Sequence, residues 1–171
     1  MKHEINQMVE EEVPFSLRKV KYAEYVRDIT ALGNPIVLLL VSVLTLAALP
    51  EWGTYLLPMI VGFLLNEALC SGIKYVWHKP RPNGQQYAGG LEKIDAGSFP
   101  SIHAARISYV YGTLGMVHYW TGRPWVLLLA LTVVVAVGYS RVFLQKHYFV
   151  DVMAGYGFGS LATFLLYQWL F

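Results

Sequence analysis

The sequence has few charged side chains and only one cysteine. Of its 171 residues, 14% are charged and 56% belong to the hydrophobic set, whereas soluble domains carry about 25% charged residues. This balance excludes a disordered chain and argues against an ordinary soluble enzyme, because too little polar material is present to cover its surface. The single Cys70 allows neither an intrachain disulfide nor a cysteine-based metal cage. A net charge of only +2 argues against a nucleic-acid partner.

Hydrophobic residues instead form long runs. Five apolar segments are each close to the ~20 residues that span a bilayer. They cover about residues 29–49, 55–77, 102–120, 124–144 and 148–171. Helices are expected in them, because lipid offers no partner to backbone polar groups. The sequence therefore predicts an all-α, polytopic membrane helical bundle with about five transmembrane helices. The segment 102–120 is the weakest of these spans, because histidine and arginine interrupt it.

The N-terminal 28 residues differ from the rest in being strongly charged. One face of a helix in this region would gather Tyr22, Tyr25, Val26 and Ile29. This pattern predicts an amphipathic helix on the membrane surface, with a solvated helical tail as the alternative. We therefore divide the chain into an N-terminal segment, residues 1–28, and a membrane-embedded domain, residues 29–171.

The order of the segments predicts where polar residues meet. Only residues 79–101 form a sizeable polar loop. If every apolar segment crosses the membrane once, residues 74–81, 101–103 and 141–151 all lie at the same membrane face. That face is the predicted location of the chemistry.

The first polar group there follows the second apolar segment. Lys74 occupies its last helical turns, and Pro80 and Pro82 constrain the backbone around Arg81. The two cations could bracket one anion near the membrane surface. Anchoring to lipid headgroups is the alternative interpretation.

The second polar group opens the third apolar segment. Pro100 and Ser101 are typical of a helix start, where free backbone N–H groups and the helix dipole favour phosphate. His103 lies in the first turn of that helix. The alternative interpretation of His103 is a buried histidine that pairs with a neighbouring group.

The third polar group lies between the last two segments. His147 and Asp151 are four residues apart, so they share a face if a helix begins near His147. A carboxylate bonded to one imidazole nitrogen leaves the other free as a nucleophile or base. Arg141 precedes them by six residues. An ion pair at a helix end is the alternative.

Together the three groups resemble the signatures of the type 2 phosphatidic acid phosphatase and vanadium haloperoxidase superfamily. The matching residues are Lys74-x6-Arg81-Pro82, Pro100-Ser101-x-His103 and Ser140-Arg141-x5-His147-x3-Asp151. Their order, spacing and placement at helix ends agree with that family. The apolar segments make the chain similar to its membrane-embedded branch.

The resemblance implies a role for each matching residue. His147 would attack phosphorus and form a phosphohistidine, and Asp151 would orient it. His103 would protonate the leaving oxygen and then activate water. The phosphate oxygens would be bound by Lys74, Arg81, Ser101 and Arg141. The family works without a divalent metal, so neither a metal nor another cofactor is expected; cations alone can stabilise the charge of phosphoryl transfer.

Three residues near these motifs need separate interpretation. The middle signature usually has glycine where this chain has Ile102, whose backbone N–H can still bind phosphate but whose side chain adds bulk. Arg106 shares a helix face with His103 and could bind a second phosphate or headgroup; pairing with a carboxylate is the alternative. Glu67 lies seven residues before Lys74 on one helix face, and we expect it to hold helices together.

The resemblance thus implies a lipid phosphatase that removes a terminal phosphate from a membrane lipid. The context of residues 95–106 is similar to the polyisoprenoid-diphosphate branch, which favours prenyl or polyprenyl diphosphates over phosphatidate or phosphatidylglycerophosphate. A phosphotransferase with the same intermediate and a catalytically silent protein that binds anionic lipid are the alternatives. We expect a multi-pass integral membrane protein, with its site on the extracytoplasmic side as in many family members. The sequence predicts no oligomeric state.

Overall fold

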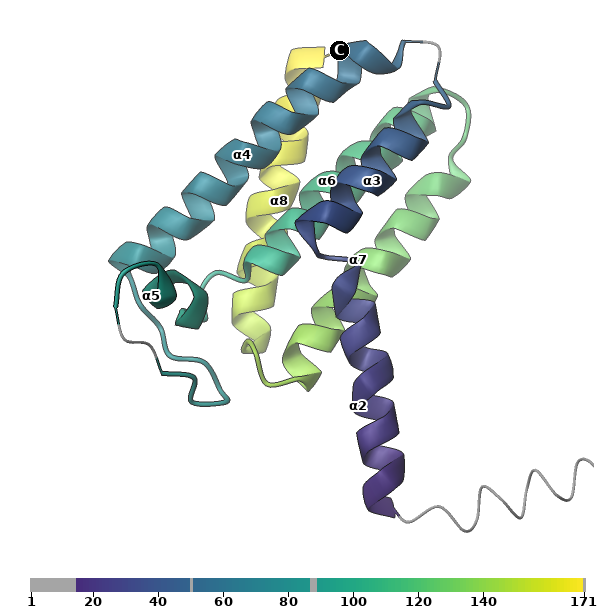
Figure 1. Cartoon of the computed structure of the whole chain (residues 1–171). Coiled ribbons are helices and arrows are strands. Elements are labelled where there is room, and N and C mark those ends of the chain that lie inside the picture. Colours follow the sequence, from purple (N-terminus) through teal and green to yellow (C-terminus); the bar gives the residue numbers. More distant parts are fainter. Residues whose placement is uncertain (1–14, 50, 87–88, 171) are drawn as a thin grey trace, which may run out of the picture.

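The computed structural model describes residues 15–49, 51–86 and 89–170, and within these ranges it contains seven helices and no strand. The helices are α2 (Phe15–Ala31), α3 (Pro35–Leu46), α4 (Trp52–Val76), α5 (Leu91–Ala96), α6 (Ile102–Trp120), α7 (Trp125–Phe143) and α8 (Phe149–Leu170). For this part of the chain the prediction of an all-α bundle is confirmed (Figure 1).

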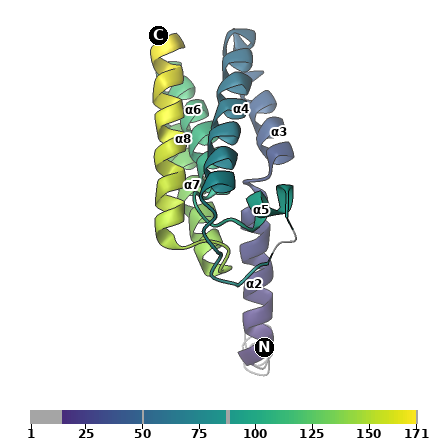
Figure 2. The ribbon, with the colours of Figure 1, turned by 90° about the vertical axis from the view of Figure 1, so that its left-hand side faces the viewer.

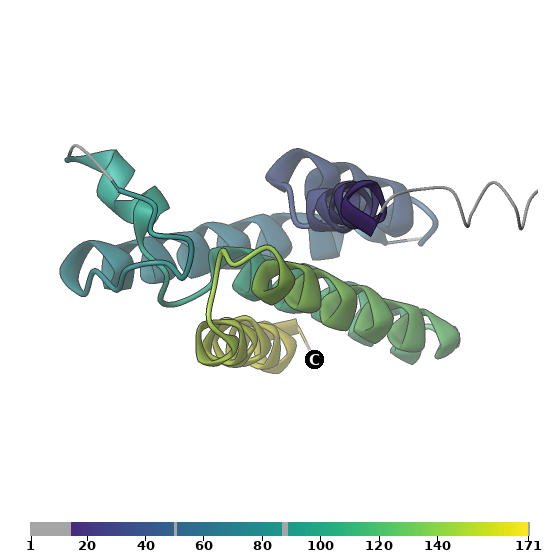
Figure 3. The same ribbon diagram turned by 90° about the horizontal axis from the view of Figure 1, so that it is seen from below.

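α6 is the central helix of the bundle. It packs against α3, α4, α7 and α8, and most of its residues are buried. Seen along the bundle, α7 and α8 lie on one side of the molecule and α3 on the other (Figure 3). Because protein rather than lipid surrounds α6, its side chains need not be uniformly apolar.

Two glycines allow α6 and α8 to approach closely. A Cβ atom on Gly155 would lie 2.5 Å from the carbonyl oxygen of Ser101, and one on Gly159 would lie 1.9 Å from Ser108 Oγ. This spacing is the small-xxx-small pattern of closely packed membrane helices. The contact joins the two helix starts, where the backbone N–H of Ser101 donates to the carbonyl of Asp151 at 2.9 Å.

By length and composition, three helices of the described residues can cross a membrane: α4, α7 and α8. A fourth crossing results if the bent pair α2 and α3 is counted as one span. α6, the predicted weak span, does not meet these criteria, because polar residues such as His103 and Arg106 lower its hydropathy. The predicted count of five spans is therefore not confirmed.

The first predicted span, residues 29–49, is wrong as a continuous helix. The helix is interrupted at residues 32–34, and the axes of α2 and α3 differ by 58°. Asn34 caps α3 by accepting from the N–H of Ile36 at 2.9 Å, and Pro35 occupies the first helical turn. These two residues begin a new helix, which the hydropathy of the segment does not reveal.

The N-terminal region contains a helix, α2. α2 continues to Ala31, so the predicted boundary at residues 28 and 29 falls inside it, and residues 1–14 lie outside the described residues. Val26 is buried, and α2 packs against α7. α2 extends past the end of the bundle (Figures 1 and 2). The placement of this helix on the membrane surface stays a prediction.

Candidate active site

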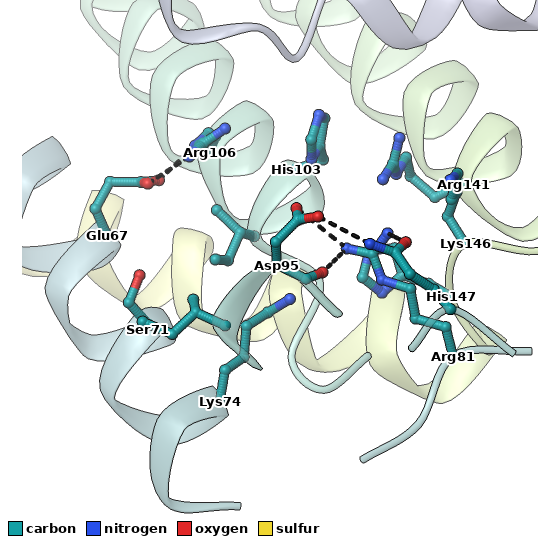
Figure 4. A pocket seen from close by; sticks show the side chains of 13 residues that line it. Glu67, Ser71, Lys74, Arg81, Asp95, His103, Arg106, Arg141, Lys146 and His147 are labelled. Carbon is teal, nitrogen blue, oxygen red and sulfur yellow. Dashed lines mark hydrogen bonds and ion pairs between the residues drawn. The ribbon is translucent and has the colours of Figure 1, made fainter. Parts of the chain in front are cut away.

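The three polar groups predicted from the sequence meet at one end of the bundle. A cavity of about 520 Å³ lies there, where α4 and α7 end and α6 begins (Figure 4). Its walls include Lys74, Arg81, Ile102, His103, Arg106, Arg141 and His147. The convergence expected from the alternating direction of the segments is therefore observed, although the helices that produce it are not five uniform spans.

The end of α4 places two cations on the cavity wall. Lys74 is buried in the last turn, and its Nζ donates to the carbonyl of Gly97 at 2.6 Å. Arg81 follows Pro80 in the loop and donates to Gln85 Oε1 at 2.9 Å and to the carbonyl of Asp95. Both cations thus bind backbone carbonyls of residues 95–97 as well as lining the cavity.

The cavity contains more positive charge than its own carboxylates balance. Arg141, in the last turn of α7, is buried and its Nε has no hydrogen-bond partner among the described residues. The Nε of Arg81 is likewise buried and unpaired within that part of the chain. Buried charged donors are normally satisfied, so these two guanidinium groups are suited to a bound anion.

His147 is held in one tautomer. Its ring is almost completely buried, and Nδ1 lies 2.7 Å from the carbonyl oxygen of Ser98. Because a carbonyl only accepts, Nδ1 must be the donor, which leaves the lone pair on Nε2. His147 therefore has an unprotonated Nε2, as a nucleophile or base requires.

The contacts of Asp151 correct the expected geometry. α8 begins at Phe149, so His147 precedes the helix, and no direct bond joins it to Asp151. The fully buried Asp151 carboxylate instead accepts from Lys79 Nζ at 2.6 Å, from the N–H of Tyr148 at 3.0 Å and from the hydroxyl of Ser98. Asp151 thus reaches His147 through Ser98, whose hydroxyl binds the carboxylate and whose carbonyl binds the imidazole.

The surroundings of His147 favour its neutral form. Burial, followed by the positive charges of Arg141 and Lys74, lowers the pKa of His147 to about 2, against a smaller opposing effect of the bond to Ser98. Burial and the charges of Arg81 and Arg141 also lower the pKa of Lys146, another residue of the cavity wall. An electropositive cavity with a neutral imidazole can attract an anion and attack it.

The start of α6 provides the second histidine. Ser101 caps the helix, accepting from the N–H of Ala104 at 3.4 Å, and it is buried and is not one of the residues that line the cavity. His103 lines the cavity, and the bend between α2 and α3 packs close to it, since a Cβ on Gly33 would lie 3.1 Å from the imidazole. The two histidines therefore face one cavity from different helices.

Ile102 is compatible with the backbone at its position. It is the first residue of α6, and the only non-glycine residue with positive φ in the described chain is Gln145. Glycine is thus not needed for conformation there. The Ile102 side chain contributes to the cavity wall instead.

Arg106 pairs with Glu67 across α6 and α4. Its Nε and Nη2 each lie 2.6 Å from a different oxygen of Glu67 (Figure 4). The pair confirms that Glu67 links two helices. Both side chains also line the cavity.

Sequence reasoning missed several residues that shape the site. Ser98 has no local sequence signal that marks it as a site residue, because its two-sided contact depends on how the loop folds. Lys79 and Lys146 resemble ordinary interfacial cations in the sequence. Among the described residues, no group of three or more His, Cys, Asp or Glu side chains is placed to hold a metal ion.

Two similar proteins are named as a phosphatase and a diphosphatase. The chain is 29% identical over 117 residues to "Lipid A 1-phosphatase" of Porphyromonas gingivalis, covering 68% of this chain and 24% of that protein. It is 34% identical over 112 residues to "Undecaprenyl-diphosphatase" of Sulfolobus acidocaldarius, covering 64% of this chain and 52% of that protein. The chain thus spans about a quarter and about half of the length of these two relatives.

A solved structure shares the fold. The transmembrane PAP2-type phosphatidylglycerolphosphate phosphatase from Bacillus subtilis matches with a TM-score of 0.70 and 25% identity, over 86% of this chain and 76% of that one. With the three apolar helices, this neighbour supports an integral membrane protein. Residues 55–171, which contain all three polar groups, match the PAP2 superfamily. By its motifs, its fold and this match over most of its length, the chain belongs to the PAP2 superfamily.

Proposed function

We propose that this chain is a lipid phosphate phosphatase that hydrolyses a prenyl or polyprenyl diphosphate through a phosphohistidine at His147. The observation that carries the proposal is one cavity whose wall brings together two histidines and, among its cations, three from the predicted motifs. These residues are Lys74, Arg81, His103, Arg141 and His147.

The proposed reaction has two steps. Nε2 of His147 attacks the terminal phosphorus, the bond to the leaving oxygen breaks, and His103 donates a proton to that oxygen. His103 then takes a proton from water, which attacks the phosphohistidine and releases inorganic phosphate and free His147. Arg81, Arg141 and Lys74 stabilise the charge on the phosphate oxygens in both steps. We assign Asp151 and Ser98 to holding His147, and Ser101 to ordering the start of α6 beside the phosphate.

An apolar cavity next to the site is suited to the lipid tail. It has a volume of about 420 Å³, lies between α3, α4 and α6, and is lined by residues such as Ile36, Leu39, Phe63 and Val110. Phe63 and Val110 are one helical turn beyond Glu67 and Arg106, which line the polar cavity. A phosphate at His147 and an apolar chain in this groove would therefore belong to one bound molecule.

Two observations favour a diphosphate as substrate. The context of residues 95–106 is similar to that of the polyisoprenoid-diphosphate branch, and one relative is named an undecaprenyl-diphosphatase. The other relatives are named for lipid A and phosphatidylglycerolphosphate, so glycerolipid phosphates are the substrates to compare.

A phosphate-release assay tests the proposed function. The purified chain in detergent is given farnesyl diphosphate, phosphatidate and phosphatidylglycerophosphate with EDTA present. We expect phosphate release that is abolished in His147→Ala and His103→Ala. His118→Ala is the matched control, because His118 is buried at the opposite end of α6. Lipid-bound product without free phosphate would indicate a phosphotransferase, and no turnover of any substrate would contradict the proposal.

We further propose that the site faces the extracytoplasmic side. Gln86 is exposed in the loop beside the cavity, and the native Cys70 is buried. A Gln86→Cys variant should therefore react with a membrane-impermeant thiol reagent in intact cells. Labelling only after lysis would place the site in the cytoplasm.

A further inference from the structure

The cavity extends beyond the residues needed for one phosphate. In Figure 4, His103 lies between Arg106 on one side and Arg141 on the other, and the Glu67–Arg106 pair forms the far wall. Arg106 is three residues after His103, or about 4.5 Å further along α6. On α4, Ser71 and Glu67 continue the polar wall away from Lys74.

The proposed reaction determines what occupies this extension. The terminal phosphate contacts His147, and His103 protonates the oxygen that leaves. The group attached to that oxygen must then lie on the other side of His103 from His147, toward Arg106. In a monoester this group begins with carbon, and in a diphosphate it is a second phosphate.

The geometry of Arg106 leaves one edge available for such a phosphate. Its contacts with Glu67 use Nε and Nη2, and neither uses Nη1. Guanidinium groups bind phosphate oxygens with planar, paired hydrogen bonds. Glu67 holds the group in place, which reduces the side-chain entropy lost when a ligand binds.

The location of the Glu67–Arg106 ion pair also supports a role in binding. Arg106 and Glu67 lie on the inner parts of two helices of a membrane protein, where charged side chains are costly. Replacing such a pair by apolar residues is often neutral or stabilising. Its contribution to stability therefore does not explain why it is placed on the wall of the cavity.

We propose that Arg106 binds the second phosphate of a diphosphate substrate and that Glu67 is the positioning residue that orients it. The pair would thus make the enzyme selective for diphosphates over monophosphates. This inference rests on the proposed function, because the direction of the leaving group follows from the roles of His147 and His103.

The test compares one tail with one or two phosphates. kcat and KM are measured for farnesyl diphosphate and farnesyl monophosphate with the wild-type chain and with Arg106→Gln. Loss of one charge-assisted contact should lower the diphosphate-to-monophosphate ratio of kcat/KM by about 10- to 100-fold. An unchanged ratio would overturn the inference and leave the phosphatase assignment intact. A wild-type chain that hydrolyses neither compound would instead overturn the proposed function.

Glu67→Gln separates recognition from a purely structural pair. The amide oxygen can still accept from Arg106, whereas the negative charge next to the second phosphate is removed. We expect the diphosphate-to-monophosphate ratio of kcat/KM to fall, in the same direction as in Arg106→Gln but by less, because Arg106 remains present and loses part of its orientation. An equal loss of kcat/KM on both substrates in this variant would mean that Glu67 only helps to hold α4 to α6.

The double variant covers the case in which Arg106→Gln loses activity on both substrates. In the single variant Arg106→Gln, the Glu67 carboxylate is left without its partner, which can destabilise the fold. The double variant Arg106→Gln with Glu67→Gln removes both charges and therefore this source of misfolding. Recovery on the monophosphate alone supports the inference, and equal recovery on both substrates contradicts it.

Discussion

Ser98→Ala tests how the buried carboxylate acts on the nucleophile. The Ser98 hydroxyl donates to Asp151 and its carbonyl accepts from His147, and Ser98 and Asp151 are fully buried. Alanine removes the hydroxyl and keeps the carbonyl. The variant therefore breaks the link from Asp151 to the loop and leaves the imidazole bond in place.

The size of the effect follows from the kind of bond that is lost. A hydrogen bond to a charged group contributes about 1.5–3 kcal/mol, and about 1.36 kcal/mol corresponds to a tenfold change in rate. The loop keeps two other anchors, Lys74 Nζ on the carbonyl of Gly97 and the N–H of Ser98 on the carbonyl of Lys79 at 2.7 Å. We therefore expect the lower end of this range, a decrease in kcat of about tenfold.

The assay is steady-state hydrolysis of farnesyl diphosphate by Ser98→Ala, with Ser108→Ala as control. Ser108 is also buried, but its hydroxyl binds the carbonyls of Ala104 and Ala105 within α6. Ser108→Ala should retain nearly wild-type kcat. If Ser98→Ala does the same while Asp151→Asn is inactive, the carboxylate acts on His147 directly and the indirect link is refuted.

Three further predictions concern protonation, packing and cavity shape. Because the pKa of His147 is lowered to about 2, its imidazole stays neutral as pH falls from 7 to 5; NMR of labelled histidine in detergent should show no protonation there, and a midpoint near 6.5 would contradict the environment described. Gly159→Ala places a Cβ 1.9 Å from Ser108 Oγ and should lower the Tm in detergent, whereas Gly157→Ala, with no atom within 4 Å, should not; equal Tm values would refute the close packing of α6 and α8. Ile102→Gly should keep the fold and change kcat/KM or substrate preference, because Ile102 lines the cavity; identical kinetics across the lipid panel would show that the side chain does not touch substrate.

The helices of this chain are predictable from the sequence where a capping residue and the hydropathy pattern agree. The predicted segment 102–120 coincides with α6, because Ser101 caps its start and the helical pattern continues to Trp120. The break between α2 and α3 was not predicted, since residues 29–49 are apolar on both sides of it. Asn34 and Pro35 are the local signal that could have located the break.

The sequence predicted which residues line the cavity better than it predicted their contacts, although Ser101 and Asp151 are not on the cavity wall. The spacing of the motifs and the alternating direction of the segments bring His103, His147 and the three cations to one cavity. The spacing of His147 and Asp151 suggested a direct bond, but that inference needed a helix starting at His147. The helix begins two residues later, so the loop carrying Ser98 occupies the space between the two side chains.

Direct detection of the covalent intermediate tests the central claim that His147 attacks the phosphate bound in this cavity. The chain is mixed with farnesyl diphosphate, quenched in alkali, where phosphohistidine survives, and digested for mass spectrometry. The account predicts one added phosphoryl group on the peptide that contains His147, and none in His147→Gln. A phosphoryl group on another residue, or its persistence in His147→Gln, would contradict the account.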